Sequence, residues 1–171
     1  MYGRRKKVAH HEAAHAVVAH SVGAGIVEGG IDIDAPSSVE GAYGRTAVNI
    51  FAHEESLTET QQKESVIHSL AIICAGAASD ARLLNRPLDE ALAAQSADAS
   101  EAKKFLANNP LVETPEEAEF LLKEAMRYTA KILDRPEIWS AIELVAEECI
   151  KNDGKLSKAQ IEGLLAKALP K

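Results

Sequence analysis

An unbroken helical stretch that carries paired histidines most constrains how this chain can fold. Residues 5–22 are rich in alanine, valine and histidine, contain neither proline nor glycine, and are followed by Gly-x-Gly. We therefore expect a helix that stops at these glycines. Within it, residues 11–15 have the form H-E-x-x-H. Residues four apart lie on one face of a helix, so the imidazoles of His11 and His15 can reach one cation. The pattern predicts a zinc site with Glu12 beside the metal as general base.

A zinc site of this kind needs a third protein ligand, with the fourth position left to water. The sequence alone leaves six candidates, which are His53, His68, Asp80, Asp89, Glu90 and Asp98. Asp98 also has a purely structural interpretation, because residues 98–101 (D-A-S-E) have the form of a capping box at a helix start.

The other histidines have simpler interpretations than metal binding. His10 and His20 fall off the face shared by the paired histidines, and we expect His10 on the surface or beside a ligand. His68 lies among apolar residues, which is typical of a histidine in the core. His53 follows a predicted strand, where it would line a cleft.

Composition narrows the class of protein. Of 171 residues, 46% are hydrophobic and 26% charged, which fits one compact core. The net charge of -7 disfavours nucleic-acid binding. No apolar run approaches the roughly 20 residues that span a bilayer, and the basic residues 4–7 lead into no signal-peptide core. We therefore expect a cytoplasmic protein without a membrane span. Cys74 and Cys149 lie in apolar helical contexts and predict buried free thiols.

Capping and turn residues predict a short β-ribbon followed by helices. Thr58 and Gln61 have the spacing of a capping box, as do Thr114 and Glu117. Apolar stripes at helical spacing run through residues 121–132 and 138–149. We expect strands over residues 26–33 and 45–51, a loop over 34–38, and helices over 58–76, 77–84, 96–106, 115–132, 138–149 and from 157 onward.

Four segments resemble, in order, the FtsH family of membrane-anchored, ATP-dependent zinc proteases. Residues 8–16 (VAHHEAAHA) look like its "VAYHEAGHA" signature, and residues 75–80 (AGAASD) resemble its "GGRAAEE" segment. Residues 96–102 (SADASEA) resemble its "SNDxxxA" segment, and residues 141–157 are similar to its carboxy-terminal "LEALAEALLEKETLDGEE" pattern. The resemblance spans residues 6 to about 165.

The resemblance implies a ligand set and a domain organisation. Asp98 matches the metal-binding Asp of the family, while Asp80 matches a Glu and is the runner-up or a residue that orients a ligand. We expect one mainly α peptidase domain over residues 1–171, with a small β-ribbon or sheet near the active site. Residues 1–109 would form its zinc-binding catalytic part and 110–171 a C-terminal helical lobe.

Departures from the family pattern concern the surroundings of the ligands. Ala14 replaces a glycine, His10 a tyrosine and Ala97 an asparagine. No G-x-x-x-x-G-K-[ST] phosphate loop is present, so the chain holds no ATPase domain of that kind.

The function that the sequence predicts is zinc-dependent endoproteolysis of unfolded polypeptides. The strand at residues 45–51 would pair with an extended substrate. The resemblance implies a homo-oligomer or a separate ATPase partner. Two alternatives are a catalytically inactive zinc-binding homologue that acts as an interaction module, and a helical binding protein without metal.

Overall fold

The chain folds mainly into helices, with one small antiparallel sheet. The computed structural model describes residues 3–37 and 42–171. The helices are α1 (Arg4–Ser21), α2 (Glu59–Leu84), α3 (Leu88–Ala94), α4 (Ser96–Ala107), α5 (Pro115–Leu133), α6 (Pro136–Lys151) and α7 (Lys158–Ala168); the strands are β1 (Ile26–Pro36), β2 (Tyr43–Val48) and β3 (Lys155–Leu156). The prediction of a mainly α fold with a small sheet is confirmed.

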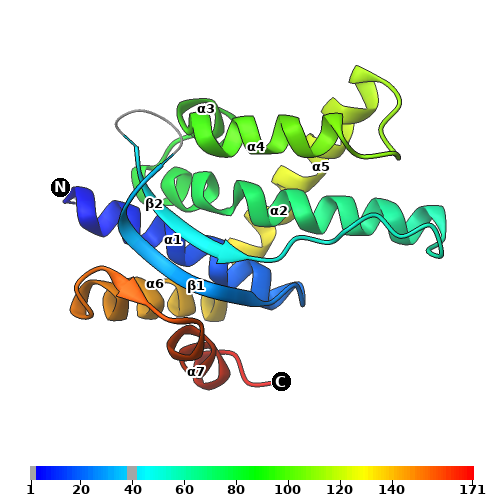
Figure 1. Ribbon diagram of the computed structural model, residues 1–171. Coiled ribbons are helices and arrows are strands. Elements are labelled where there is room, and N and C mark those ends of the chain that lie inside the picture. The colour runs from blue at the N-terminus through cyan, green and yellow to red at the C-terminus, as the bar shows by residue number, and fades with distance from the viewer. Residues whose placement is uncertain (1–2, 38–41) are drawn as a thin grey trace.

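Helix α1 lies at the centre of the molecule, between α2 and α6, and the sheet covers a third side (Figure 1). Its small side chains, among them Ala9, Ala13 and Ala16, are fully buried. Alanine lets neighbouring helices approach closely, which explains why a helix with few large apolar residues occupies the core. The histidines on α1 are thereby enclosed on several sides.

The sheet has the order β2-β1-β3, with β1 antiparallel to both neighbours, so β2 is an edge strand. Ile31 and Ile33 of β1 are buried in the main apolar core. The predicted loop at 34–38 is wrong over residues 34–36, because β1 continues to Pro36 through its pairing with Tyr43. Residue 38 lies outside the described residues.

The predicted strand over residues 45–51 has different ends in the structure. It begins earlier, at Tyr43, and ends at Val48. The backbone N–H of Phe51 donates to Ser69 Oγ (2.9 Å) of α2, so the chain leaves the sheet before residue 51.

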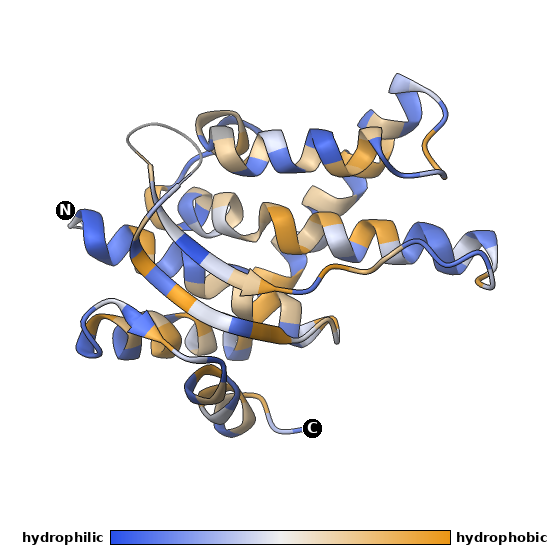
Figure 2. Ribbon diagram, in the orientation of Figure 1, coloured by the Kyte–Doolittle hydropathy of each residue, from blue (hydrophilic) through white to orange (hydrophobic). Residues whose placement is uncertain are grey.

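Helix α2 runs without a break past Gly76, so the prediction of separate helices over 58–76 and 77–84 is wrong. It begins at the Thr58–Gln61 capping box and ends at Asn85, whose φ of 50° is left-handed. Figure 2 shows hydrophilic residues on its first turns and mostly hydrophobic ones in its middle. By length and composition α2 would suffice to cross a bilayer, but 78% of its most apolar window is buried inside the protein.

The last third of the chain is helical but does not pack mainly on itself. Helix α5 packs on α2 and helps to enclose a second apolar cluster, whereas α6 packs on α1 within the main core. The capping boxes at Thr114 and Ser157 are formed. Helix α3 was not expected from the sequence. Both cysteines are buried free thiols, as predicted.

Candidate metal centre and cleft

His11, His15 and Asp98 converge on one point, where α1 meets the first turn of α4. Asp98 Oδ2 lies 3.4 Å from His11 Nε2, and Asp98 Oδ1 lies 3.6 Å from His15 Nε2. One ligand atom from each residue falls within 4.8 Å of the others. Among the described residues this is the single cluster of three or more metal-ligating side chains. Two imidazole nitrogens and a carboxylate form a donor set that suits zinc.

The other ring nitrogen of each histidine is held by a second partner. His15 Nδ1 donates to the carbonyl oxygen of Ile72 (2.7 Å), and His11 Nδ1 lies 3.3 Å from Asp80 Oδ2. Because a carbonyl and a carboxylate accept, Nδ1 carries the proton in the neutral ring, and the Nε2 lone pair is left for a cation. Such partners are typical of histidines that bind metals.

When no metal is bound, the surroundings of His11, His15 and Asp98 favour the charged form of each side chain. Burial lowers the pKa of His11, but Asp80 and Asp98 outweigh it, so this pKa is raised well above 6.5. Burial also lowers the pKa of His15, but Asp98 outweighs this effect, so the pKa of His15 is raised as well. Burial raises the pKa of Asp98, but the adjacent histidines lower it further, so its carboxylate stays ionised.

Gly76 of α2 makes room for the His11 ring. A Cβ built at Gly76 would overlap the Nε2 side of that imidazole. The middle of α2 therefore needs a residue without a side chain here, although glycine weakens a helix by about 0.5–1 kcal/mol relative to alanine. This close approach explains the glycine that was mistaken for a helix boundary.

The carboxylate of Glu12 is buried and fixed beside the cluster. Thr46 Oγ1 of β2 donates to Glu12 Oε2 (2.6 Å) and also lies 2.9 Å from the backbone oxygen of Glu12. A Cβ at Gly44, whose φ is 111°, would collide with Glu12 Oε1. Strand β2 thus holds the Glu12 carboxylate from one side. Thr46 bonds Oε2, and Gly44 leaves space for Oε1 because it has no side chain.

Asp98 is not the N-cap of α4, so its capping-box interpretation is wrong. The N-cap residue is Gln95, and Asp98 lies in the first turn. Its Oδ2 instead accepts from the backbone N–H of Ala77 (3.2 Å), which ties α4 to the middle of α2. Both carboxylate oxygens of Asp98 therefore lie next to the histidines of α1, and one of them also contacts α2.

The remaining ligand candidates lie elsewhere. Asp80 contacts His11 from the far side of the ring and also accepts a hydrogen bond from Gln95 Nε2. Asp89 and Glu90 are exposed on α3. His68 packs between Phe51 and Tyr128, and His53 is exposed and absent from the cleft wall.

The two remaining histidines of α1, His10 and His20, also differ from each other. His10 is 3% exposed and its Nδ1 lies 2.8 Å from the carbonyl oxygen of Lys6, so the surface interpretation is wrong. His20 lies near the opposite end of α1.

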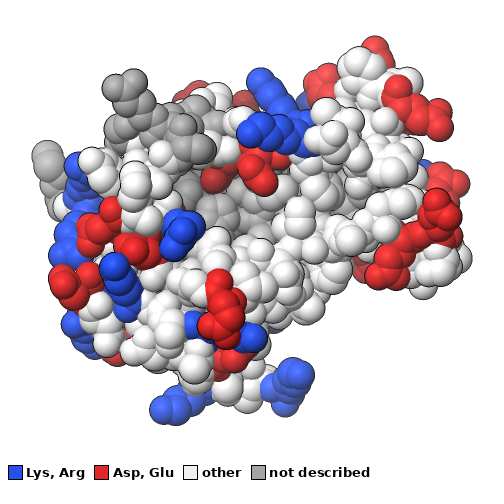
Figure 3. Space-filling view, in the orientation of Figure 1, with Lys and Arg blue, Asp and Glu red and all other residues white. Residues whose placement is uncertain are grey.

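A cleft of about 390 Å³ opens onto the cluster. Its walls come from α1, from edge strand β2, from α2 and from the start of α4. Its wall includes Tyr43, Arg45, Val48, Ile50 and Ile73. Figure 3 shows the same face hollowed between the sheet and α4.

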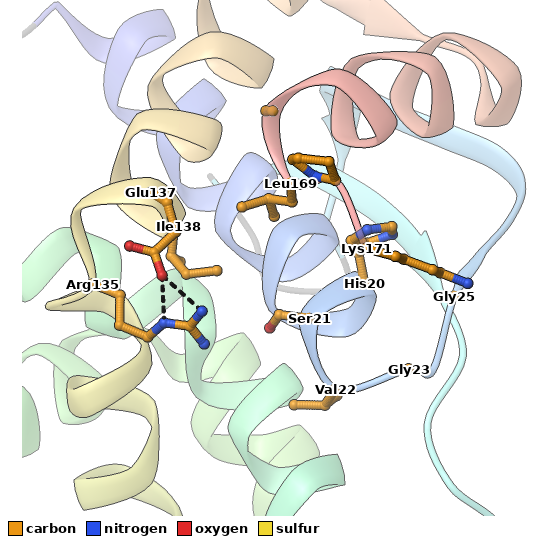
Figure 4. A pocket seen from close by; sticks show the side chains of 12 residues that line it. His20, Ser21, Val22, Gly23, Gly25, Arg135, Glu137, Ile138, Leu169 and Lys171 are labelled. Carbon is orange, nitrogen blue, oxygen red and sulfur yellow. Dashed lines mark hydrogen bonds and ion pairs between the residues drawn. The ribbon is translucent and has the colours of Figure 1, made fainter.

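A wider cavity of about 790 Å³ lies at the other end of α1 (Figure 4). It is lined by His20, by the chain end at Leu169 and by Arg135, which forms an ion pair with Glu137 (2.7 Å). Its described lining includes one histidine and no group of three metal-ligating side chains, so the smaller cleft is the better candidate for chemistry.

Sequence reasoning missed the groups that orient the site, which are Thr46, Ile72 and Gln95. Each reaches the cluster through tertiary contacts, and none carries a recognisable local pattern.

In comparisons with known proteins, no protein-family model and no curated protein matched the chain.

Proposed function

We propose that the protein is a zinc-dependent endopeptidase that cleaves unfolded polypeptides. The observation that carries the proposal is the convergence of two imidazole Nε2 atoms and one carboxylate, next to a separate, buried carboxylate on Glu12. A purely structural metal site needs no such extra carboxylate at its side. The cleft in front of the cluster gives a substrate access.

His11, His15 and Asp98 would hold the zinc, leaving one position open. When bound, zinc supplies a Lewis acid that lowers the pKa of a coordinated water and polarises a peptide carbonyl. The Nδ1 partners Ile72 and Asp80 orient the two rings for this role.

Glu12 would move the proton. Its carboxylate accepts a proton from the attacking water and then delivers it to the amine that leaves. The hydrogen bond from Thr46 Oγ1 occupies Oε2 and fixes the carboxylate, while Oε1 accepts no hydrogen bond from the described residues and is the oxygen assigned to the proton.

Edge strand β2 would position the substrate. Among described residues it pairs with β1 alone, so its outer edge is open to an extended peptide. Pairing through backbone groups accepts many sequences and requires a segment without structure of its own. The apolar side chains of Val48, Ile50 and Ile73 give one end of the cleft a surface for an apolar residue.

The resemblance to FtsH proteases supports the same reaction, and it leaves a homo-oligomer or a separate ATPase as candidate partners. A catalytically inactive zinc-binding homologue is the alternative. The burial and the support of Glu12 favour the active form, because a carboxylate at 5% exposure is costly to keep without a role.

Metal analysis combined with hydrolysis of unstructured casein tests the proposal. The wild-type protein should carry about one zinc per chain. Glu12→Gln should keep the zinc and lose about 10²–10⁴-fold in rate, since an amide accepts no proton. Asp98→Ala should lose most of the zinc, whereas the exposed Asp89→Asn serves as the matched control and should keep it. A zinc-free wild-type protein, or an active Glu12→Gln variant, contradicts the proposal.

A further inference from the structure

A second, smaller pocket adjoins the cleft at the amino-terminal end of α1. It has a volume of about 220 Å³, and it shares His11, Tyr43 and Gln95 with the cleft wall. The residues that line it but not the cleft include Arg4 and Lys7 of α1 and Asp80 of α2. Figure 3 shows Lys and Arg side chains, mixed with acidic ones, at the left margin, where Figure 1 places the start of α1.

Arg4 offers a positioned guanidinium group in this pocket. Its Cζ atom lies 4.2 Å from the centre of the Tyr43 ring. Within the described ranges no carboxylate forms an ion pair with Arg4. A guanidinium stacked on an aromatic ring keeps its N–H edges available, and these edges match the two oxygens of a carboxylate.

Lys7 adds a second positive charge. Its Nζ atom lies 3.7 Å from Asp80 Oδ2, and its side chain is 37% exposed. Asp80 lines the same pocket, but it is 2% exposed and its Oδ2 already faces His11 and Gln95. The charge that a ligand meets at the open side of the pocket is therefore positive.

We propose that this pocket binds a carboxylate of the substrate polypeptide and makes an acidic group near the cleaved bond a determinant of specificity. The inference rests on the proposed function and adds a substrate preference to it. Both an Asp or Glu side chain and a chain-terminal carboxylate have the required chemistry.

The position of the carboxylate follows from the direction of β2. This strand runs from Tyr43, at the pocket, to Val48. A peptide paired antiparallel to it runs the other way, so residues that follow the cleaved bond lie nearer Tyr43. Because His11 borders both the cleft and the pocket and a strand advances about 3.3 Å per residue, we expect the acidic group within the first three residues after that bond.

Matched fluorogenic peptides test the preference. In one series, a single residue one, two or three positions after the cleaved bond is Glu or its uncharged isostere Gln, with an amidated chain end. A further peptide carries Gln and a free terminal carboxylate. We expect about threefold to tenfold higher kcat/KM for one Glu position or for the free acid, as for a partly exposed charged hydrogen bond. The peptide with the higher kcat/KM shows whether the pocket takes a side-chain carboxylate or a chain-terminal one.

Variants assign the effect to the pocket. Arg4→Gln should remove the difference between the Glu and Gln peptides, and Arg4→Lys should keep part of it. Arg127→Gln, which changes an exposed arginine on α5, is the matched control and should leave the preference as in the wild type. Equal kcat/KM for every Glu and Gln pair, or a preference that survives Arg4→Gln, overturns the inference.

Binding separates this inference from the proposed function. Fluorescence anisotropy of the same peptides on zinc-loaded Glu12→Gln protein measures recognition without cleavage. Tighter binding of the carboxylate peptide that is lost in an added Arg4→Gln change supports the pocket, even if the wild type cleaves none of the peptides. Equal binding of all peptides overturns the pocket, even if the wild type is an active peptidase.

Discussion

A single glycine in the middle of α2 decides whether His11 can occupy its observed position. A Cβ at Gly76 would overlap the imidazole, so the ring or the helix would have to shift. We expect Gly76→Ala to weaken zinc binding by about 10–100-fold, as for the loss of groups that orient a ligand. Competition with a chelating dye measures this affinity.

Gly163 of α7 provides the control for that change. Nothing lies within 4 Å of a Cβ built there, and the residue is exposed. Gly163→Ala should raise the free energy of unfolding by about 0.5–1 kcal/mol and leave the zinc affinity unaltered. Equal zinc affinities of the two variants would show that the ring does not depend on the space at Gly76.

The opposite pKa shifts in the cluster predict how the stability of metal-free protein depends on pH. The pKa values of His11 and His15 are raised, so their contribution is complete below 6.5 and is lost as pH rises through the raised values. The pKa of Asp98 is lowered, so its contribution is present above 3.8 and is lost as pH falls. Thermal unfolding in EDTA should therefore give the highest Tm between these limits.

Zinc should reverse the trend on the alkaline side. It competes with protons for the histidine nitrogens, so the increase in Tm on adding zinc should grow from about pH 6 to about pH 8. His15→Ala is the control and should show little increase at any pH. A zinc effect on Tm that stays constant over this range contradicts the coupling.

The sequence predicts some residues of the site better than others. The pairing of His11 with His15 follows from helical spacing, and Glu12 follows from its place in the H-E-x-x-H motif. Residue chemistry left six third-ligand candidates open, and the FtsH resemblance chose Asp98. Thr46 and Ile72 escaped prediction, because they reach the site through strand pairing and helix packing that no short pattern encodes.

At the scale of elements, the starts of the three helices that open with a capping box were predictable, because their causes are local. The three capping boxes form from residues within three positions of one another. Strand ends and the continuity of α2 were not, because Tyr43, Ser69 and His11 decide them from distant parts of the chain.

The Thr114 capping box should contribute measurably to stability. Thr114 Oγ1 accepts from the backbone N–H of Glu117 (3.2 Å), whose side chain accepts from the N–H of Thr114. Thr114→Ala should lower the free energy of unfolding by about 1 kcal/mol, because the first turn of α5 loses a partner. Thr114→Ser keeps the hydroxyl and should retain most of that stability. Urea denaturation measures both, and equal losses would show that the hydroxyl does not act as the cap.

At the scale of the whole molecule, the cleft is small, about 390 Å³, and the sequence contains no phosphate-binding loop. Opening a packed substrate domain costs several kcal/mol, so the proposed peptidase would act on segments that are already unfolded. We expect slow cleavage of casein, little cleavage of a stable folded protein, and no effect of ATP on either. Time courses with a folded substrate and its unfolded counterpart, with and without ATP, measure this. Rapid digestion of the folded form contradicts the expectation.

The outer edge of β2, which pairs with no further strand among the described residues, has a consequence for the protein in concentrated solution. An unpaired strand edge invites self-association, and proteins usually blunt such edges with charges, irregular backbone or short length. Here the edge is six residues long, with Gly44 at a positive φ and Arg45 beside it. These features would limit stacking of one molecule on another, whereas the proposed function needs room for a single substrate strand. The same brevity would therefore restrict how many residues of a substrate strand the proposed peptidase holds at once.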